Sequence, residues 1–302
     1  MATTPFGLDM GRKARVRKSS TRQDRLDKFG ILQPQEVILQ LFGEYVSGND
    51  RAWSGGLVQL LGDLGFSSAA SRVALNRVIA RGLLAPSKEG RFVFYTITPR
   101  LKFVHDEGRR QTYSPVSSPD WTGTWTLVCY AVPEEHRPQR ARLGRWLGMR
   151  GFGSLQEGIW IGAGDNEADV RRLTTRLGFA KHSLVFVGHL GEESDVRSAV
   201  ERGWNIDELK KMYDIYVSEF AAYRKAGKRA SLQPRDAFVL RTRVIEMFRQ
   251  TTIKDPRMPD SILKVKWKRK EAIETFRELQ DALCPQASSY FRELAVTGTY
   301  EA

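Results

Sequence analysis

Apolar side chains recur every three or four positions in three successive segments between residues 34 and 81, and this spacing predicts three amphipathic helices. Pro34 opens the first helix, because the fixed backbone angle of proline suits the first helical turn. Its apolar stripe consists of Val37, Ile38, Leu41, Phe42 and Tyr45. The stripe of the second helix consists of Leu57, Leu60, Leu61 and Leu64. These stripes and the inner face of the third helix predict a three-helix core.

A tight turn separates the second helix from the third. Gly62 and Gly65 enclose two residues there, and glycine takes backbone angles that other residues avoid. Ser67 or Ser68 can cap the third helix by accepting a hydrogen bond from its free amide hydrogens, and Gly82 ends that helix. This order predicts a helix-turn-helix, a unit that enters a DNA groove.

The third helix has a narrow outer face with small side chains. A helical wheel places five residues on the arc that faces the core, namely Ser71, Ala74, Leu75, Val78 and Ile79. Outside this arc lie Ala69, Val73, Asn76, Arg77 and Ala80, with Arg72 on the border. Such a face can approach the edges of DNA bases closely, with Asn76 and Arg77 as the polar readers. The alternative is an ordinary amphipathic helix with a solvated polar face.

A basic hairpin follows the third helix. Residues 83–87 and 92–97 have the composition of strands, and residues 88–91 supply a turn with Lys88 and Arg91 at its tip. These cations would contact DNA phosphates, which adds affinity without sequence preference. The whole pattern predicts a winged helix-turn-helix. Its predicted DNA contacts are Ser68, Arg72, Val73, Asn76, Arg77, Lys88 and Arg91.

The middle of the chain alternates strand-like and helical patterns in the order of a ferredoxin-like unit. Strands are predicted at residues 125–132, near 153, at 158–161 and at 184–187, and helices at 136–150 and 167–177. A long helix over residues 205–224 follows, and its apolar side fits either a core or a dimer surface. That side consists of Ile206, Leu209, Tyr213, Ile215 or Tyr216, and Phe220. The predicted fold class is multidomain α+β, with a mainly helical C-terminal domain.

Motifs from all three parts of the chain occur together in one known family. The N-terminal motifs are residues 41–46 (LFGEYV), residues 72–77 (RVALNR) and Gly90-Arg91 with Tyr95. The central motifs are residues 120–128 (DWTGTWTLV), 151–153 (GFG) and 158–160 (GIW). The C-terminal motif is residues 255–259 (DPRMP) with Trp267. With these motifs the chain resembles the PaaX family, repressors of phenylacetic acid degradation, over residues 33–283.

The resemblance implies a Cas2-like central domain and release from DNA by an aromatic acyl-coenzyme A effector, with no other cofactor. A homodimer on a palindromic DNA operator is expected, because one recognition helix covers only a few base pairs. The chain departs from the family at Leu83, where tryptophan is usual, and at Ser71, which replaces an aliphatic core residue.

Composition divides the chain into domains. Residues 112–119 (TYSPVSSP) are rich in serine and proline, which predicts a semi-extended linker. The predicted parts are a basic flexible arm at 1–30, the winged-helix domain at 31–111, the linker at 112–119, the ferredoxin-like domain at 120–203 and the helical domain at 204–302.

The net charge of +13 is concentrated in two zones. Residues 1–120 hold 18 Lys and Arg against 11 Asp and Glu, residues 121–224 hold 14 against 14, and residues 225–270 hold 14 against 4. In the first zone, the basic arm serves either phosphate contacts or solubility. The second zone is either solvated helix surface or a site for the phosphates of the effector, with Arg241, Arg243 and Arg249 as candidates.

The Cas2 resemblance raises a metal-dependent nuclease as the alternative function. Such cleavage needs carboxylates that hold magnesium. The Cas2 pattern has an aspartate at the end of the first strand, where this chain has Cys129 and Tyr130. Asp120 precedes the strand, and Glu134 and Glu135 suit the start of the next helix. Because no other catalytic motif or metal-ligand spacing occurs, the sequence predicts a regulator rather than an enzyme.

The sequence also predicts where the protein resides. No apolar run reaches the roughly 18 residues that a membrane span needs, and residues 1–10 lack the apolar core of a signal peptide. A cytoplasmic protein is therefore expected. The two cysteines, Cys129 and Cys284, are expected to be reduced and structural, since they are too few for a disulfide framework.

Overall fold

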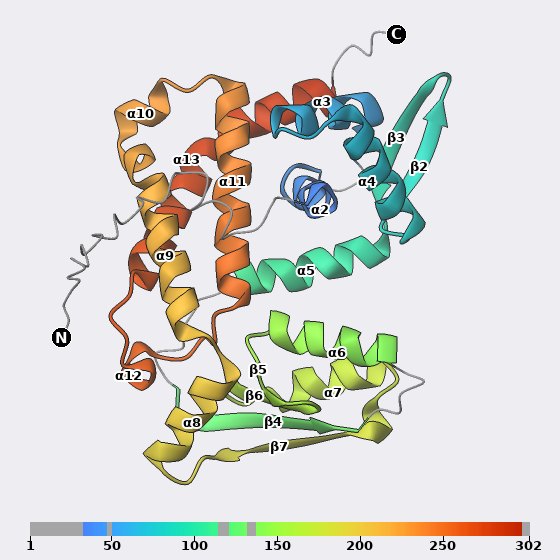
Figure 1. Cartoon of the computed structure of the whole chain (residues 1–302). Helices are drawn as coiled ribbons and strands as arrows, with labels where there is room; N and C mark the ends of the chain where they lie inside the picture. Colours follow the sequence, from blue (N-terminus) through green and yellow to red (C-terminus); the bar gives the residue numbers. More distant parts are fainter. Residues whose placement is uncertain (1–32, 47–49, 114–120, 132–136, 298–302) are drawn as a thin grey trace, which may run out of the picture. The chain divides into compact units, whose positions relative to one another are not determined.

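The computed structural model describes residues 33–46, 50–113, 121–131 and 137–297 (Figure 1). The predicted basic arm at residues 1–30 lies outside the described ranges, and so do residues 114–119 of the predicted linker. Residues 112 and 113 belong to a helix, so the helical structure extends two residues into the predicted linker.

The N-terminal part contains the three helices and the hairpin in the predicted order. Its elements are α2 (Pro34–Tyr45), β1 (Ala52–Trp53), α3 (Ser54–Asp63), α4 (Ser68–Ala80), β2 (Leu84–Glu89), β3 (Phe92–Ile97) and α5 (Pro99–Tyr113). The predicted stripes of α2 and α3 are buried, except that Leu64 is half-buried just after α3. The sequence pattern does not predict β1, which pairs with β3 in an antiparallel sheet of order β1-β3-β2.

The hairpin turn is shorter than the sequence pattern predicts. β2 continues through Glu89, which pairs with Phe92, so that Gly90 and Arg91 alone form the turn. Gly90 has a φ of +59°, and a two-residue hairpin turn needs such a left-handed angle, which glycine adopts without a steric clash. The prediction of a four-residue turn was therefore wrong, and Lys88 lies on β2.

The central part forms a four-stranded antiparallel sheet of order β5-β6-β4-β7. Its elements are β4 (Thr124–Tyr130), α6 (Arg137–Met149), β5 (Gly153–Gln156), β6 (Ile159–Ala163), α7 (Glu167–Arg176), the 3-10 helix η3 (Ala180–His182), β7 (Ser183–His189) and α8 (Glu193–Gly203). α6 and α7 cover one face, where Val128 packs with Leu143, Leu147 and Val170 (Figure 1). The predicted order of strands and helices is confirmed.

The C-terminal part is helical, as predicted. Its elements are α9 (Ile206–Phe220), the 3-10 helix η4 (Ala221–Arg224), α10 (Ala226–Ala230), α11 (Pro234–Ile253), α12 (Asp260–Leu263) and α13 (Arg269–Ala295). Tyr216, and not Ile215, belongs to the buried side of α9. Tyr216 packs against Phe220 and against Phe248 of α11, so the apolar stripe of α9 forms part of the helical core.

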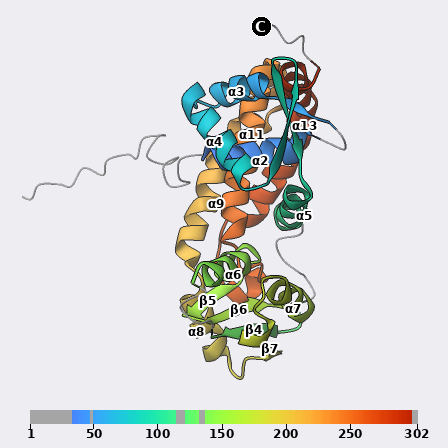
Figure 2. The same cartoon turned by 90° about the vertical axis from the view of Figure 1, so that its right-hand side faces the viewer.

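One hydrophobic core joins α2, α3 and α4 to α11 and α13. Phe238 of α11 and Phe291 of α13 are buried in it, and Tyr45 of α2 stacks on Phe291 with ring centroids 4.8 Å apart. α3 lies beside α13 in both views (Figures 1 and 2). The two backbones are so close that a Cβ on Gly56 would lie 2.1 Å from the carbonyl oxygen of Leu294. The N-terminal helices therefore pack directly on the C-terminal ones.

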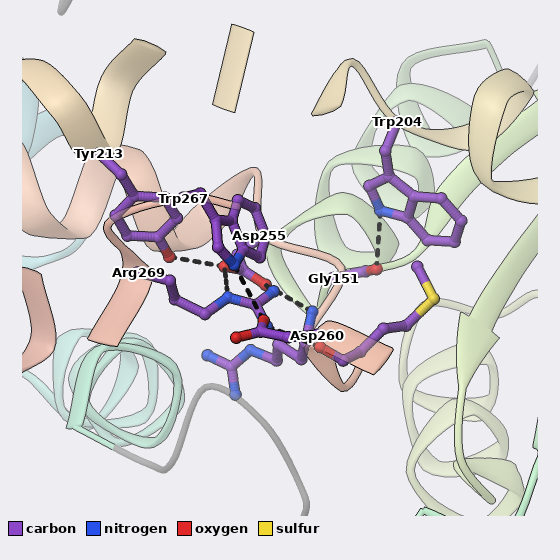
Figure 3. Close-up of polar contacts among 9 residues, drawn as sticks. Gly151, Trp204, Tyr213, Asp255, Asp260, Trp267 and Arg269 are labelled. Carbon is purple, nitrogen blue, oxygen red and sulfur yellow. Dashed lines mark hydrogen bonds and ion pairs between the residues drawn. The ribbon is translucent and has the colours of Figure 1, made fainter. Parts of the chain in front are cut away.

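A buried carboxylate anchors the segment between α11 and α13 (Figure 3). Asp255 accepts hydrogen bonds from the Tyr213 hydroxyl at 2.6 Å, from Arg269 Nε at 2.9 Å and from the backbone N–H of Arg257 at 2.7 Å. Burial raises the pKa of Asp255, and the adjacent Arg269 guanidinium opposes this rise. The indole of Trp267 covers that guanidinium at 4.0 Å. This network gives the first residue of the DPRMP motif and Trp267 a structural role.

Candidate nucleic-acid interface

α4 is held so that its predicted reading face is exposed. Ser67 caps the helix, since its Oγ accepts a hydrogen bond from the Ala70 N–H at 3.2 Å. The buried side consists of Ser71, Ala74, Leu75 and Val78, as predicted, with Ile79 half-buried. The α4 residues predicted to contact DNA are all exposed, namely Ser68, Arg72, Val73, Asn76 and Arg77.

The two departures from the family pattern are accommodated in the core of the N-terminal part. Ser71 is fully buried, and its hydroxyl donates a hydrogen bond to the carbonyl oxygen of Ser67 at 3.0 Å. A serine in a helix can satisfy its hydroxyl in this way without a distant partner. Leu83 is also buried. The fold therefore tolerates both residues.

α4 and the hairpin lie side by side (Figures 1 and 2). A groove of about 370 Å³ is lined by α3, α4 and β3. Arg72 and Asn76 line it from α4, and Val93 and Tyr95 line it from β3. Asn76, a predicted base reader, and Arg72, at the border of the predicted face, therefore share one concave surface with the hairpin.

The hairpin carries its two predicted cations, Lys88 and Arg91, on exposed positions. A third cation, Arg51, lies against the hairpin. The Arg51 guanidinium lies over the Phe94 ring at 4.3 Å, and its Nη2 donates to Glu89 Oε2 at 2.7 Å. This hydrogen bond lowers the pKa of Glu89. Sequence reasoning missed Arg51, because its partner Glu89 lies 38 positions away and β1, which follows Arg51, is too short to show a period.

The three arginines proposed for the effector all lie on α11, and each contacts a different carboxylate from another helix. Arg241 is buried, whereas Arg243 and Arg249 are partly exposed. All three lie against carboxylates that come from other helices, and spacing along α11 does not reveal such partners. For Arg241, Arg243 and Arg249 these partners are Glu44 at 2.7 Å, Glu219 at 3.8 Å and Glu36 at 2.8 Å.

The N-terminal part offers two more carboxylates to the C-terminal helices. Asp63, at the end of α3, accepts hydrogen bonds from Arg235 Nε and from the Tyr290 hydroxyl, both at 2.7 Å. Burial and the Asp63 carboxylate raise the pKa of Tyr290 to about 12. Asp50 pairs with Arg292 at 3.1 Å. Part of the C-terminal positive charge therefore neutralises acidic groups of the N-terminal part.

A different place gathers cations around a cavity. The cavity measures about 580 Å³ and lies between Phe103 of α5, Arg150 and α7. Arg176 lies over the Phe103 ring at 3.6 Å, and Arg150 lies over the Trp146 ring at 5.6 Å. The remaining lining residues are Asp169, Arg171, Arg172, Leu173 and Thr175. Arginines and an aromatic ring in one hollow suit an organic anion.

Comparison with known proteins places most of the described chain in one family. Residues 33–101 match the family model described as PaaX-like protein, residues 118–200 match the PaaX protein central Cas2-like domain, and residues 204–293 match the PaaX-like protein C-terminal domain. The chain is 27% identical over 271 residues to the transcriptional repressor PaaX of Escherichia coli (strain K12), which covers 88% of this chain and 85% of that protein. The chain belongs to the PaaX family.

A solved structure shares the fold of this PaaX family member. It is an uncharacterized protein from Mycobacterium tuberculosis, 19% identical in sequence, with a TM-score of 0.51 over 85% of this chain and 98% of that chain. At this identity the likeness concerns the fold alone.

Nuclease activity of the Cas2-like domain in this PaaX family member would need carboxylates that hold a metal ion. Asp120, Glu134 and Glu135 lie outside the described residues. Where the chain is described, no three His, Cys, Asp or Glu side chains gather so as to hold a metal ion.

Cys129 and Cys284 are both free thiols, and burial raises the pKa of Cys129. None of the helices in the described ranges is long and apolar enough to cross a bilayer.

Proposed function

We propose that this protein is a transcriptional repressor that binds double-stranded DNA through a winged helix-turn-helix. The observation that carries the proposal is the exposed face of α4, with Asn76 and Arg77, beside a hairpin that exposes Lys88 and Arg91. Membership of the PaaX family supports it, because the Escherichia coli relative is named a transcriptional repressor.

The chemistry of this surface suits a major groove. Asparagine pairs with adenine and arginine with guanine through two hydrogen bonds each. The small side chains of Ala69, Val73 and Ala80 allow the helix to come close to the bases. Lys88 and Arg91 would meet the phosphates, which fixes the register of the protein on DNA.

The proposed repressor acts as a homodimer on a palindromic operator. A single α4 would contact only a few base pairs, and two copies related by a two-fold axis read two half-sites. The family resemblance supports an operon for the catabolism of an aromatic compound as the target.

An aromatic acyl-coenzyme A is the proposed effector. The cavity beside Phe103 supports this better than the arginines of α11, because it is a hollow in which Arg176 lies over an aromatic ring, whereas the α11 arginines bind carboxylates of other helices. α5 begins two residues after β3 and reaches the cavity through Phe103. A ligand that prefers one arrangement of α5 would therefore shift the equilibrium of the reading surface and release the operator.

The proposal is tested by fluorescence anisotropy on the DNA upstream of the operon that adjoins the gene. We expect the chain to bind this DNA more tightly than a scrambled duplex of equal length, and Asn76→Ala to abolish that difference. Lys211→Ala, an exposed cation on α9, is the control and should bind as the wild type does. Equal affinity of the wild type for both duplexes would contradict the proposal.

The effector is tested on the same complex. An aromatic acyl-coenzyme A should release the DNA, whereas the free aromatic acid should not. Arg176→Ala should weaken this response and leave DNA affinity without ligand unchanged. If the ligand releases DNA from Arg176→Ala as efficiently as from the wild type, the effector does not bind in this cavity.

A further inference from the structure

α4 exposes an aliphatic side chain on the face that is proposed to read DNA. Val73 is 50% exposed. The other aliphatic residues of α4 larger than alanine turn toward the core, since Leu75 and Val78 are buried and Ile79 is half-buried against it. Among the described residues of α4, Val73 is therefore the one large apolar side chain that faces outward.

The fold itself gives no reason for a valine at this position. A β-branched side chain loses rotamer freedom in a helix, so alanine would suit an exposed helical position better. Ala69 and Ala80, which share the outer face with Val73, show that alanine is compatible with it. Single exposed apolar residues are common on protein surfaces, so exposure alone does not assign a role to Val73. Its place among the reading residues does.

Val73 lies between the two polar readers around the helix. At about 100° per residue, it is about 60° from Asn76 on one side and about 40° from Arg77 on the other. Both neighbours are exposed, and neither side chain forms a hydrogen bond or an ion pair with another described residue. The centre of the reading face is therefore apolar, and its flanks carry free hydrogen-bonding groups.

This arrangement matches the chemistry of one base in particular. Thymine alone among the four bases presents a methyl group in the major groove, and an apolar side chain recognises it by contact. Asparagine and arginine suit adenine and guanine instead, through pairs of hydrogen bonds. An apolar side chain between these two readers would leave the polar edge of any other base without a partner, which costs binding free energy.

We propose that Val73 is a specificity-determining residue that recognises the methyl group of a thymine in the major groove. This inference rests on the proposed function, because it assigns a base to the centre of the reading face. The helix rises about 1.5 Å per residue, so Val73 precedes Arg77 by about 6 Å along its axis. Successive bases of one DNA strand are about 3.4 Å apart. The thymine therefore lies within about two base pairs of the base that Arg77 reads.

The test removes the thymine methyl group alone. Deoxyuridine in place of thymidine does this and keeps every hydrogen-bonding group of the base pair. In the DNA upstream of the operon that adjoins the gene, thymines are replaced one at a time, and fluorescence anisotropy measures the affinity of the full-length protein. At one thymine of each half-site we expect the wild type to lose affinity by about fourfold, which corresponds to the burial of one methyl group.

The variants connect this loss to Val73. Val73→Ala should bind the unmodified duplex more weakly, and its loss with deoxyuridine at that thymine should be less than about twofold, because the contact is already gone. Circular dichroism checks its fold, which alanine should preserve at an exposed helical position. Lys88→Ala is the matched control. It should weaken binding to both duplexes and keep the fourfold difference, since Lys88 belongs to the hairpin and is proposed to meet phosphates.

A second modification tests the methyl group without thymine. When the identified T·A pair is replaced by C·G, methylation of that cytosine at C5 should restore affinity to the wild type by about fourfold and leave Val73→Ala unaffected. A wild type that responds equally to cytosine and 5-methylcytosine does not recognise a methyl group at this position.

The remaining outcomes separate this inference from the proposed function. If the wild type prefers its operator to a scrambled duplex but no single deoxyuridine weakens binding, the inference alone fails. It also fails if Val73→Ala keeps the full fourfold loss, or if the thymine lies well beyond about two base pairs from the base at which Arg77→Ala loses its preference. Equal affinity of the wild type for operator and scrambled duplex contradicts the proposed function, and the inference with it.

Discussion

Arg241 of α11 places its Nη2 2.7 Å from Oε2 of Glu44 on α2, and both side chains are largely withdrawn from solvent, with 2% and 11% exposed. The two residues are 197 positions apart in sequence. Arg241 also lies over the ring of Tyr45 at 5.0 Å. The pair therefore joins α2 of the N-terminal part to α11 of the C-terminal part.

Removal of one member of this pair should destabilise the protein strongly. Glu44→Ala leaves the Arg241 charge buried without its carboxylate, which typically costs about 3 to 5 kcal/mol. Urea unfolding measures the loss. Asp169→Ala breaks the exposed pair with Arg172 on α7 and should cost less than about 1 kcal/mol. Similar losses in the two variants would show that burial of the first pair has no energetic weight.

Because α3 and α13 approach each other closely, alanine substitutions at two glycines of α3 should have opposite effects on stability. Gly56→Ala forces the backbones apart at Leu294 and should cost about 1 to 3 kcal/mol, as overpacking does. Gly62→Ala, in the same helix, meets no atom within 4 Å and should stabilise by up to about 1 kcal/mol, because alanine favours helix. Thermal or urea unfolding compares them. If both variants gain stability, α3 and α13 are not in contact in solution.

Base reading and phosphate contact should separate on DNA. Arg77→Ala should lose about 1 to 3 kcal/mol on the operator and much less on unrelated DNA, if the arginine reads a base. Lys88→Ala should weaken both by similar factors and reduce the slope of log affinity against log salt by about 1. Anisotropy titrations at several salt concentrations give both quantities. Equal losses on both duplexes for Arg77→Ala would make it a phosphate contact.

His105 should make stability depend on pH. Its Nε2 lies 2.8 Å from the carbonyl oxygen of Leu39, and burial lowers its pKa below the ordinary 6.5. At a pH between the pKa of folded His105 and 6.5, His105 is protonated in the unfolded chain but neutral in the folded one. The free energy of unfolding therefore rises with pH in this window. The contribution is complete above pH 6.5 and is lost as pH falls through the folded pKa.

The measurement is urea unfolding at pH 7.5 and pH 5 for the wild type and His105→Gln. The variant should lose less stability between the two values. Glu44, Asp106 and Arg109 also act on this imidazole, and they are unchanged in both proteins. An identical pH dependence in the variant would show that His105 does not cause it.

Periodicity was sufficient for the elements that bury one regular face. The stripe of α2 and the inner arc of α4 are buried as their spacing predicts, because each helix must cover the same core. β1 has two residues and therefore no period to detect. The hairpin turn was predicted too long, because Lys88 and Glu89 are polar although they lie on a strand that is exposed along most of its length.

The arginines of α11 show a different limit. Sequence reasoning found their charge but not their partners, since Glu36 and Glu44 come from the opposite end of the chain. A count of charges cannot distinguish a ligand site from an ion-paired interface between two packed parts of the chain. The arginines around Phe103 went unnoticed for the same reason, because α5, α6 and α7 meet there only in three dimensions.

Asp63 is the last residue of α3, just before the turn to α4, and its hydrogen-bond donors Arg235 and Tyr290 lie 172 and 227 positions downstream in the sequence. An excised fragment ending at residue 113 would keep the described residues that are proposed to contact DNA, but it would lose both hydrogen-bond partners of Asp63. A design that moves α2, α3, α4 and the hairpin onto another scaffold would therefore need to include α11 and α13, which carry these two partners.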